Sequence, residues 1–393
     1  MRVLYVSHTA VVSGAERSLL DLLGALPDTV RPLLATPPGQ LQTLAQQRGI
    51  ATTTIAGTAG SLRVHPLHTP RALVEMAVAA WQVRRAAASH RADVVHANSI
   101  RAGIVLAFAR LRRTPTIVHV RDCLPPGATS KVTLRLVAAT ATTVIANSHY
   151  TADSVRAAAP GARVDVVHNP VDLARFDPDA IDRVDARARL GAAGGRSLLL
   201  GVVGQLSPWK GQDTAIEALG LLCREGLDAH LLLVGSAKFV ARSTRFDNNE
   251  YVARLQALVE RDGLEDRVSW LGEREDVPEI IRALDVLLLP SWEEPFGRAV
   301  VEAMAMGVPV VATGVGGPCE IMQDGREGYL REPRNAPAWA HAVRLLADSP
   351  ALASEMGRAG RRRAERSFTL QQHVTSVLKV YERATAARGR RAA

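Results

Sequence analysis

Cysteine, aromatic residues and long apolar runs are all scarce in this sequence. The three cysteines, Cys123, Cys223 and Cys319, lie far apart, which fits a reducing compartment and predicts no zinc site. Aromatic residues make up 4% of the chain, which argues against extensive stacking surfaces. No run approaches the ~18 apolar residues of a membrane span, and the start, MRVLYVSH, lacks an apolar leader. We therefore expect a cytoplasmic protein without a spanning helix.

Acidic residues are scarce in the first half only. Residues 1–172 hold 18 Lys and Arg against 9 Asp and Glu, whereas residues 173–393 hold 30 of each kind. A basic half predicts an anionic partner, which could be a phosphorylated acceptor, a membrane surface or nucleic acid. The alternative is that arginine simply replaces lysine on solvated faces. Nucleic acid is disfavoured because interleaved aromatics and a recognisable binding module are missing.

The length of 393 residues and the order of elements predict two domains. Short apolar runs alternate with helical segments along both halves, which is typical of α/β domains with parallel sheets. We predict an N-terminal domain over 1–172, a linker over 173–195 and a C-terminal domain over 196–370. A last helix over 371–393 is expected to cross back to the N-terminal domain and to end in a basic tail.

Polar side chains end several predicted strands of the first half. His96 and Asn98 end one strand, and His119, Arg121 and Asp122 end another. Ligands of open α/β sheets bind at the carboxyl ends of strands, so these residues are site candidates. His119 follows an apolar run, so it could equally be a hydrogen-bonded histidine of the core.

The stretch 290–317, PSWEEPFGRAVVEAMAMGVPVVATGVGG, predicts a second site. Its helix, over about 297–306, is apolar on nearly every face and should be buried. A helix start offers free N–H groups and a partial positive charge, which suit phosphate. Glu302 would be costly inside such a helix without a hydrogen-bond partner. It could instead cap a neighbouring backbone group or reach solvent.

Seven motifs in order resemble one enzyme family. They are SGAERSLL, HVRD, ANS at 146–148, HNPVD at 168–172, GQLSPWKG, RVSWLGEREDVP and EEPFGRAVVEAMAMGVPVVAT. Together they resemble the retaining, family-4 type of glycosyltransferases, also called group 1. The resemblance implies the GT-B fold, in which two Rossmann-like domains face each other across a cleft. The N-terminal domain would bind the acceptor and the C-terminal domain the nucleotide sugar.

The resemblance also implies roles for matching residues. Glu294 would contact the donor sugar, His119 would face that sugar from the other domain, and Lys210 would bind the donor diphosphate. Glu302 would bind the ribose hydroxyls. The remaining implied donor-binding positions are Gly14, Gly204, Gln205, Leu271, Gly272, Arg274, Phe296, Gly297 and Arg298.

One of these positions departs from the family. Gln205 stands where the family usually has arginine, five residues before Lys210. A lost charge-assisted contact typically costs ~1.5–3 kcal/mol. Arg245, Arg298 or Arg121 could supply the missing charge. The alternative function is therefore a non-catalytic protein of the same fold that binds sugar nucleotides.

The implied reaction moves a sugar from a nucleoside-diphosphate donor to an acceptor hydroxyl, with retention, without a metal and without a further cofactor. A UDP-sugar is favoured and a GDP-sugar is the other choice. Glycans, lipid-linked glycans and small molecules all stay open as acceptors. We prefer front-side attack to a covalent intermediate on Glu294. Basic residues around two apolar helices further predict peripheral association with anionic lipid at the inner face of the membrane. They are Arg101, Arg110, Arg112, Arg113, Lys131 and Arg135.

Overall fold

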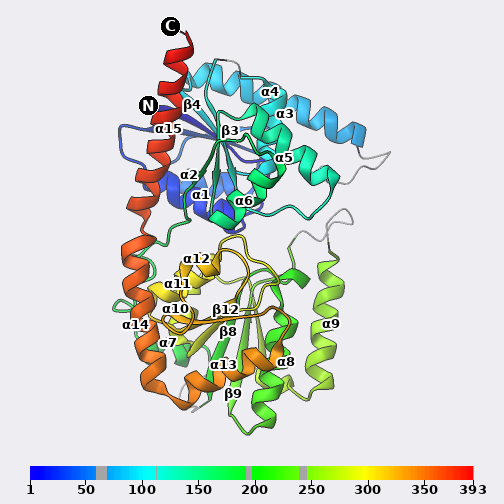
Figure 1. Cartoon of the computed structure of the whole chain (residues 1–393), viewed down its shortest axis with the longest axis vertical. Helices are drawn as coiled ribbons and strands as arrows, with labels where there is room; N and C mark the ends of the chain where they lie inside the picture. The colour runs from blue at the N-terminus through cyan, green and yellow to red at the C-terminus, as the bar shows by residue number, and fades with distance from the viewer. Residues whose placement is uncertain (59–68, 112, 192–196, 239–245, 393) are drawn as a thin grey trace. The chain divides into compact units, whose positions relative to one another are not determined.

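The computed structural model describes residues 1–58, 69–111, 113–191, 197–238 and 246–392. The chain divides into two compact units. The first unit comprises Met1–Pro170 together with Leu370–Ala393, and the second comprises Val171–Thr369. Each unit has one parallel sheet with helices on both faces (Figure 1). In the part of the chain described, none of the helices is both long enough and apolar enough to cross a bilayer.

The sheet of the first unit has seven parallel strands in the order β3-β2-β1-β4-β5-β6-β7. The strands are β1 Arg2–Val6, β2 Arg31–Thr36, β3 Thr52–Thr54, β4 Val94–Ala97, β5 Thr116–Val120, β6 Thr143–Ala146 and β7 Val164–Val166. The central strands β4, β5 and β6 are buried along their whole length, as expected where helices cover both faces. The strand order reverses at β1, which pairs with both β2 and β4. Ligands of open α/β sheets bind beside such a switch point.

Two groups of helices cover the two faces of this sheet (Figure 1). One group is α3 Thr69–His90, α4 Ile100–Ala109, α5 Ala128–Thr140 and α6 His149–Ala158; the other is α1 Gly14–Gly24, α2 Gln40–Gln47 and α15 Leu370–Ala392. Alternate residues of β1 divide between the two cores. Leu4 and Val6 pack with the first group, and Val3 and Tyr5 pack with the second. This period of two is what places an apolar strand inside two helix layers.

The sheet of the second unit has six parallel strands in the order β10-β9-β8-β11-β12-β13. The strands are β8 Leu198–Val203, β9 Ala229–Val234, β10 Val268–Gly272, β11 Val286–Leu289, β12 Val310–Thr313 and β13 Gly328–Arg331. The helices are α7 Arg183–Arg189, α8 Gln212–Arg224, α9 Asn248–Arg261, α10 Val277–Ala283, α11 Arg298–Ala305, α12 Pro318–Ile321, α13 Ala336–Asp348 and α14 Pro350–Ser367. Helices α8, α9 and α13 pack on one face, and α7, α10 and α11 pack on the other. Strands β8 and β11 are neighbours in the middle of the sheet, so the loops that follow them start side by side.

The segment 173–195, predicted as a linker, contains a packed helix. The side chain of Asp182 caps the start of α7 by accepting from the backbone N–H groups of Val184 and Asp185, at 2.8 and 2.9 Å. Arg187 Nη1 then donates to Asp285 Oδ2 at 3.0 Å, which holds α7 against the start of β11. The prediction missed this helix because its seven residues, RVDARAR, carry almost no apolar pattern.

The last helix, α15, contributes to the core of the first unit. Val374, Val377, Val380 and Tyr381 are buried there beside residues of α1 and β1. Their spacing places one apolar stripe of the helix on the sheet. The first unit is therefore assembled from both ends of the described chain.

Candidate active site

The predicted site in the second unit is built on the loops after β8 and β11. A one-turn 3₁₀ helix, η1 Pro208–Lys210, follows β8, and the loop of residues 290–297 connects β11 to α11. The backbone N–H of Trp292 donates to the carbonyl of Trp209 at 2.8 Å, which joins the two loops. The ammonium of Lys210 lies 4.0 Å from the centre of the Trp209 ring, a cation–π contact that orients the lysine.

The structure brings Lys210 and Glu294 into direct contact. Lys210 Nζ lies 2.6 Å from Glu294 Oε2, and Ser291 Oγ donates to the same oxygen at 2.9 Å. The side chains of Lys210 and Glu294 are 16% and 8% exposed. Both donors bind Oε2, and among the described residues none binds the second oxygen of Glu294, Oε1. Two groups that were predicted separately therefore form one charged pair.

The backbone of Glu294 is fixed from the side opposite the lysine. Its N–H donates to the carbonyl of Val315 at 3.2 Å, and its carbonyl accepts from the N–H of Gly317 at 2.8 Å. A Cβ atom on Gly316 would stand 2.2 Å from the Glu294 carbonyl oxygen, and one on Gly317 would stand 2.4 Å from Phe296 Cα. Only glycine fits at both places, because any side chain would push the two loops apart.

The helix after this loop begins at an uncapped end. Gly297 is the N-cap of α11, with φ 102°, and no side chain caps the first turn. The start of α11 therefore presents the partial positive charge of a helix N-terminus, which suits an anion. Arg298 Nη2 donates to Glu302 Oε1 at 3.2 Å, one turn further along. This contact supplies the partner that the half-buried Glu302 requires, from the helix itself.

Other predicted donor-binding residues lie at the same edge of the second sheet. Gly204 and Gln205 follow β8, and the carbonyl of Gln205 accepts from Gln212 Nε2 at 2.9 Å. Leu271 and Gly272 end β10, the edge strand. Arg274 is engaged by Asp276 through two contacts of 2.7 and 2.6 Å. Of the arginines considered as a substitute for the missing charge, Arg298 lies at this site, Arg121 lies in the first unit and Arg245 falls outside the described residues.

The structure buries His119 inside the first unit, and its contact with a donor sugar stays a prediction. The residue is 0% exposed in β5, and neither ring nitrogen has a hydrogen-bond partner among the described residues. Its ring centre lies 5.4 Å from that of His96 and 6.4 Å from that of His373 on α15. Burial, together with the charge of Arg121, holds the pKa of His119 well below its ordinary value. His119 is thus held in its neutral form, and its burial fits the core histidine that its apolar run had left open as an alternative.

The polar cluster at the carboxyl edge of the first sheet is bound to itself. Arg121 is buried and donates to Asn98 Oδ1 at 3.1 Å, to Ser18 Oγ at 3.0 Å and to Asn169 Oδ1 at 2.5 Å. Gly14, by contrast, is exposed at the start of α1, just after the switch-point strand β1. The first unit therefore has an exposed glycine at this edge, while Arg121 ties α1 to the loops that follow the strands from inside.

Three further residues near these edges were missed by sequence reasoning. Ser291 and Trp209 orient Glu294 and Lys210, as described above. His8 follows β1 and shares a 2.9 Å hydrogen bond between its Nδ1 and Ser99 Oγ. Burial and the charge of Arg101 lower the pKa of His8 to about 4. The signal that could have revealed His8 and Ser291 is that each follows a strand within two residues.

Two family descriptions match the chain in succession. "Glycosyltransferase Family 4" matches residues 12–175, and "Glycosyl transferases group 1" matches residues 185–363. The D-inositol 3-phosphate glycosyltransferase of Streptomyces avermitilis is 33% identical over 330 residues, which cover 79% of this chain and 70% of that protein. The chain belongs to the group 1, family-4 glycosyltransferases. A protein of the same name from Nocardioides is 30% identical over 335 residues, covering 79% and 72% of the two chains.

Solved structures agree with this glycosyltransferase over nearly its whole length. The crystal structure of Anabaena HepE in complex with UDP-glucose has a TM-score of 0.83 and 28% identity, covering 97% of this chain and 99% of that one. Sucrose-phosphate synthase from Thermosynechococcus elongatus has a TM-score of 0.82 at 22% identity, covering 98% and 100%. The glycosyltransferase thus has the GT-B fold that its motifs predicted, with two parallel-sheet, Rossmann-like domains.

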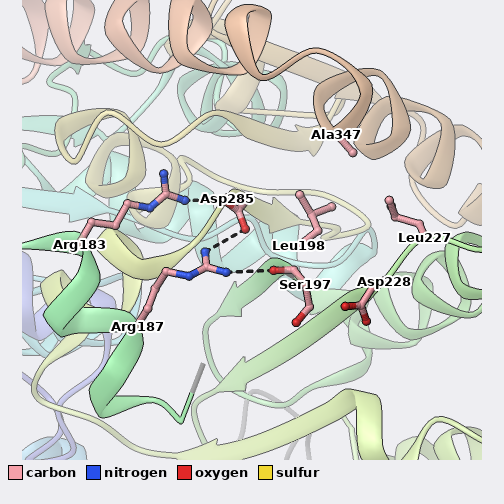
Figure 2. A pocket seen from close by; sticks show the side chains of 8 residues that line it. All are labelled: Arg183, Arg187, Ser197, Leu198, Leu227, Asp228, Asp285 and Ala347. Atoms are coloured by element: carbon pink, nitrogen blue, oxygen red, sulfur yellow. Dashed lines mark hydrogen bonds and ion pairs between the residues drawn. The ribbon is translucent and has the colours of Figure 1, made fainter. Parts of the chain in front are cut away.

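A cavity of about 480 Å³ in the second unit of the glycosyltransferase lies away from the candidate site (Figure 2). Ser197, Asp228 and Asp285 line it, and each residue directly precedes a strand, β8, β9 or β11. The cavity therefore lies at the amino edge of the sheet, whereas Lys210 and Glu294 follow the carboxyl ends. Arg183 and Arg187 both point at Asp285 (Figure 2), so two cations of this cavity share one carboxylate of the protein.

Proposed function

We propose that this glycosyltransferase moves a hexose from a UDP-sugar to an acceptor hydroxyl with retention of configuration. The observation that carries the proposal is the Lys210–Glu294 pair. Glu294 lies three residues before Gly297, the N-cap of α11. A cation and a helix N-terminus next to a carboxylate suit a ligand with a diphosphate at one end and hydroxyl groups at the other.

Each group at this edge has a proposed part in donor binding. Lys210 and the N–H groups of Phe296, Gly297 and Arg298 hold the diphosphate. Glu294 accepts a hydrogen bond from a sugar hydroxyl at Oε1, because Oε2 is occupied by Lys210 and Ser291. Glu302 uses Oε2 for the ribose, since Arg298 occupies its other oxygen. The backbone of Leu271–Arg274 reads the base.

The proposed reaction breaks the bond between the anomeric carbon and the β-phosphate oxygen. The acceptor oxygen attacks the same face of the sugar, and its proton passes to the departing phosphate. Lys210 and the helix start stabilise the negative charge that develops on the diphosphate, so we propose that no metal ion is required. A covalent sugar trapped on Glu294 would contradict front-side attack.

The choice of UDP rests on HepE, which has been crystallised with UDP, with UDP and glucose, and with UDP-glucose. The relatives named D-inositol 3-phosphate glycosyltransferase make a phosphorylated polyol one acceptor to test, beside glycans and lipid-linked glycans. A basic first unit suits any acceptor that carries phosphate.

Gln205 supports one competing function, a non-catalytic protein that binds sugar nucleotides. Glutamine can donate a hydrogen bond to the diphosphate but adds no positive charge. At this edge, Lys210 pairs with Glu294 and Arg298 pairs with Glu302. We expect them to suffice for turnover, with weaker donor binding than an arginine at position 205 would give.

The test has two stages. Thermal unfolding is first measured with UDP-glucose, GDP-glucose and ADP-glucose, since a ligand at 100 times its Kd stabilises a fold by ~2.7 kcal/mol. Transfer from the stabilising donor is then measured across the acceptor panel, with Glu294→Ala and Lys210→Ala as test variants. Glu260→Ala, an exposed glutamate on α9, is the matched control.

We expect stabilisation by UDP-glucose, transfer that both test variants abolish, and full activity in Glu260→Ala. Stabilisation by GDP-glucose alone would reassign the base. Donor binding without transfer across the whole panel would establish the non-catalytic function. A product of inverted anomeric configuration, read from its NMR coupling, would contradict retention.

A further inference from the structure

Three helices of the first unit expose large apolar side chains on their outer surface. Helices α3, α4 and α5 lie next to one another on one face of the sheet (Figure 1). On α3, the exposed fractions are 46% for Leu73, 63% for Val74, 42% for Val78 and 59% for Trp81. On α4 and α5, they are 45% for Phe108, 63% for Val132 and 41% for Leu136. We call these seven residues the apolar face.

On helix α3 the exposed apolar side chains lie on one side of the helix. Leu73, Val74, Val78 and Trp81 recur at helical spacing and form one stripe along the first turns. The opposite stripe, with Ala79, Ala80, Val83, Ala86 and Ala87, is buried against the sheet. Helix α3 is therefore apolar on two sides, and the described residues of its own chain cover only one of them.

Basic residues flank the apolar face. Arg84 and Arg85 continue the exposed stripe of α3, and the Arg85 guanidinium lies 5.7 Å from the centre of the Trp81 ring. On α5, Lys131 and Arg135 are exposed beside Val132 and Leu136. Within the sequences of α3, α4 and α5, Glu75 is the only acidic residue.

Arg101 differs from the other basic residues that were predicted to meet anionic lipid. Arg101 is only half exposed, and burial lowers its pKa while the carboxylate of Asp122 counters that effect, so it does not belong to this surface. Arg112 lies outside the described residues. Arg110 and Arg113, after α4, are exposed and add positive charge to the same side of the unit.

We propose that the apolar face docks on an anionic lipid bilayer. Trp81, Val74, Phe108 and Val132 would enter the boundary between headgroups and acyl chains, and the flanking arginines and lysine would bind lipid phosphates. A second copy of this chain fits less well, because two such faces would bring like charges together. The proposal goes beyond the transfer reaction: it assigns a partner to a surface that the donor site does not use.

The experiment measures co-sedimentation of the full chain with vesicles. One set contains phosphatidylcholine alone and the other contains phosphatidylcholine and phosphatidylglycerol in equal parts, each at low and at high salt. The test variants are two double substitutions: an apolar one, Val74→Glu with Trp81→Glu, and a basic one, Arg84→Glu with Arg85→Glu. Val184→Glu, at a valine 72% exposed on α7 of the other unit, and Arg358→Glu, on α14, are the matched controls. Circular dichroism checks that every variant is folded.

We expect binding to the mixed vesicles at low salt, a strong reduction at high salt and little binding to phosphatidylcholine alone. The double variant Val74→Glu, Trp81→Glu should partition into the vesicles roughly tenfold more weakly or worse. The double variant Arg84→Glu, Arg85→Glu should bind more weakly at low salt only. Brominated lipid should quench tryptophan fluorescence in the native chain and less in Trp81→Phe.

Equal binding by the variants and the native chain would overturn the proposal, as would the absence of binding at low salt. A dimer that forms in solution and is lost in the Val74→Glu, Trp81→Glu variant would assign the face to a second copy instead. Vesicle binding is measured without donor or acceptor. A failure to find transfer therefore leaves this result unaffected, and a failure to bind vesicles leaves the transfer assay unaffected.

Discussion

Replacing Ser291 by alanine should lower turnover by releasing Glu294 from its present orientation. Ser291 is 0% exposed, and its hydroxyl donates to Glu294 Oε2 at 2.9 Å. Lys210 Nζ holds the same oxygen at 2.6 Å. In Ser291→Ala the lysine alone fixes the carboxylate, which can then rotate about its terminal bond. The variant removes one buried hydroxyl and leaves both charges in place.

The size of the effect follows from the charged acceptor. A hydrogen bond to an ionised group contributes ~1.5–3 kcal/mol. If that contribution orients Glu294 in the transition state, its loss corresponds to roughly a 10- to 150-fold fall in kcat/KM. We expect most of the loss in kcat, because the diphosphate contacts of Lys210 and of the α11 start are retained.

The assay is the initial rate of UDP release at varied donor concentration, with the acceptor that the panel identifies. Ser269→Ala is the matched control, since its hydroxyl bonds His230 at 2.8 Å near the amino edge of the sheet. Ser291→Thr keeps a hydroxyl and should recover activity. An unchanged kcat in Ser291→Ala, with the fold intact, would refute the orienting role of Ser291.

Three further predictions concern stability. Burial lowers the pKa of His96 to about 3 and that of His119 below its ordinary value. Both rings are therefore neutral when folded and gain protons on unfolding, so the free energy of unfolding should fall as pH drops below ~6.5, by up to ~1.4 kcal/mol per pH unit for each histidine. Urea unfolding at a series of pH values should show this slope, and His119→Phe should reduce it. Gly317→Ala should cost ~1–3 kcal/mol by overpacking, because its Cβ would stand 2.4 Å from main-chain atoms of the loop before α11. Gly314→Ala should be neutral in the same urea titration, because its Cβ would meet its nearest neighbour at 3.6 Å, an ordinary van der Waals distance. Asp285→Ala should cost roughly 1.5–3 kcal/mol, since two arginines and a backbone N–H lose their shared acceptor; an unchanged melting temperature would contradict that role.

Local patterns were sufficient to predict most of the sheet architecture. Two of the short apolar runs, at residues 31–36 and 286–289, form β2 and β11. Ser148 opens α6 as an N-cap, accepting from the N–H of Thr151 at 3.0 Å. Apolar runs and capping residues act within a few positions of the chain, so the sequence displays them directly.

Contacts between distant segments explain what the sequence could not predict. His119 follows an apolar run, but its burial depends on His373 and the rest of α15, more than two hundred residues later. The Lys210–Glu294 contact likewise depends on β8 and β11 being neighbours. The Arg298–Glu302 pair is different, because a spacing of four on a helix can be read from sequence. A donor role was considered for both residues, but their contact with each other was not.

The position of α15 also bears on how the chain folds during its synthesis. The residues of the second unit, Val171–Thr369, are consecutive, so they can collapse on their own sheet as soon as the ribosome has released them. The core of the first unit still lacks Val377 and Tyr381 at that moment. The half of the protein that is translated first is therefore completed last. Until then, the apolar surface that α15 covers in the folded unit is exposed.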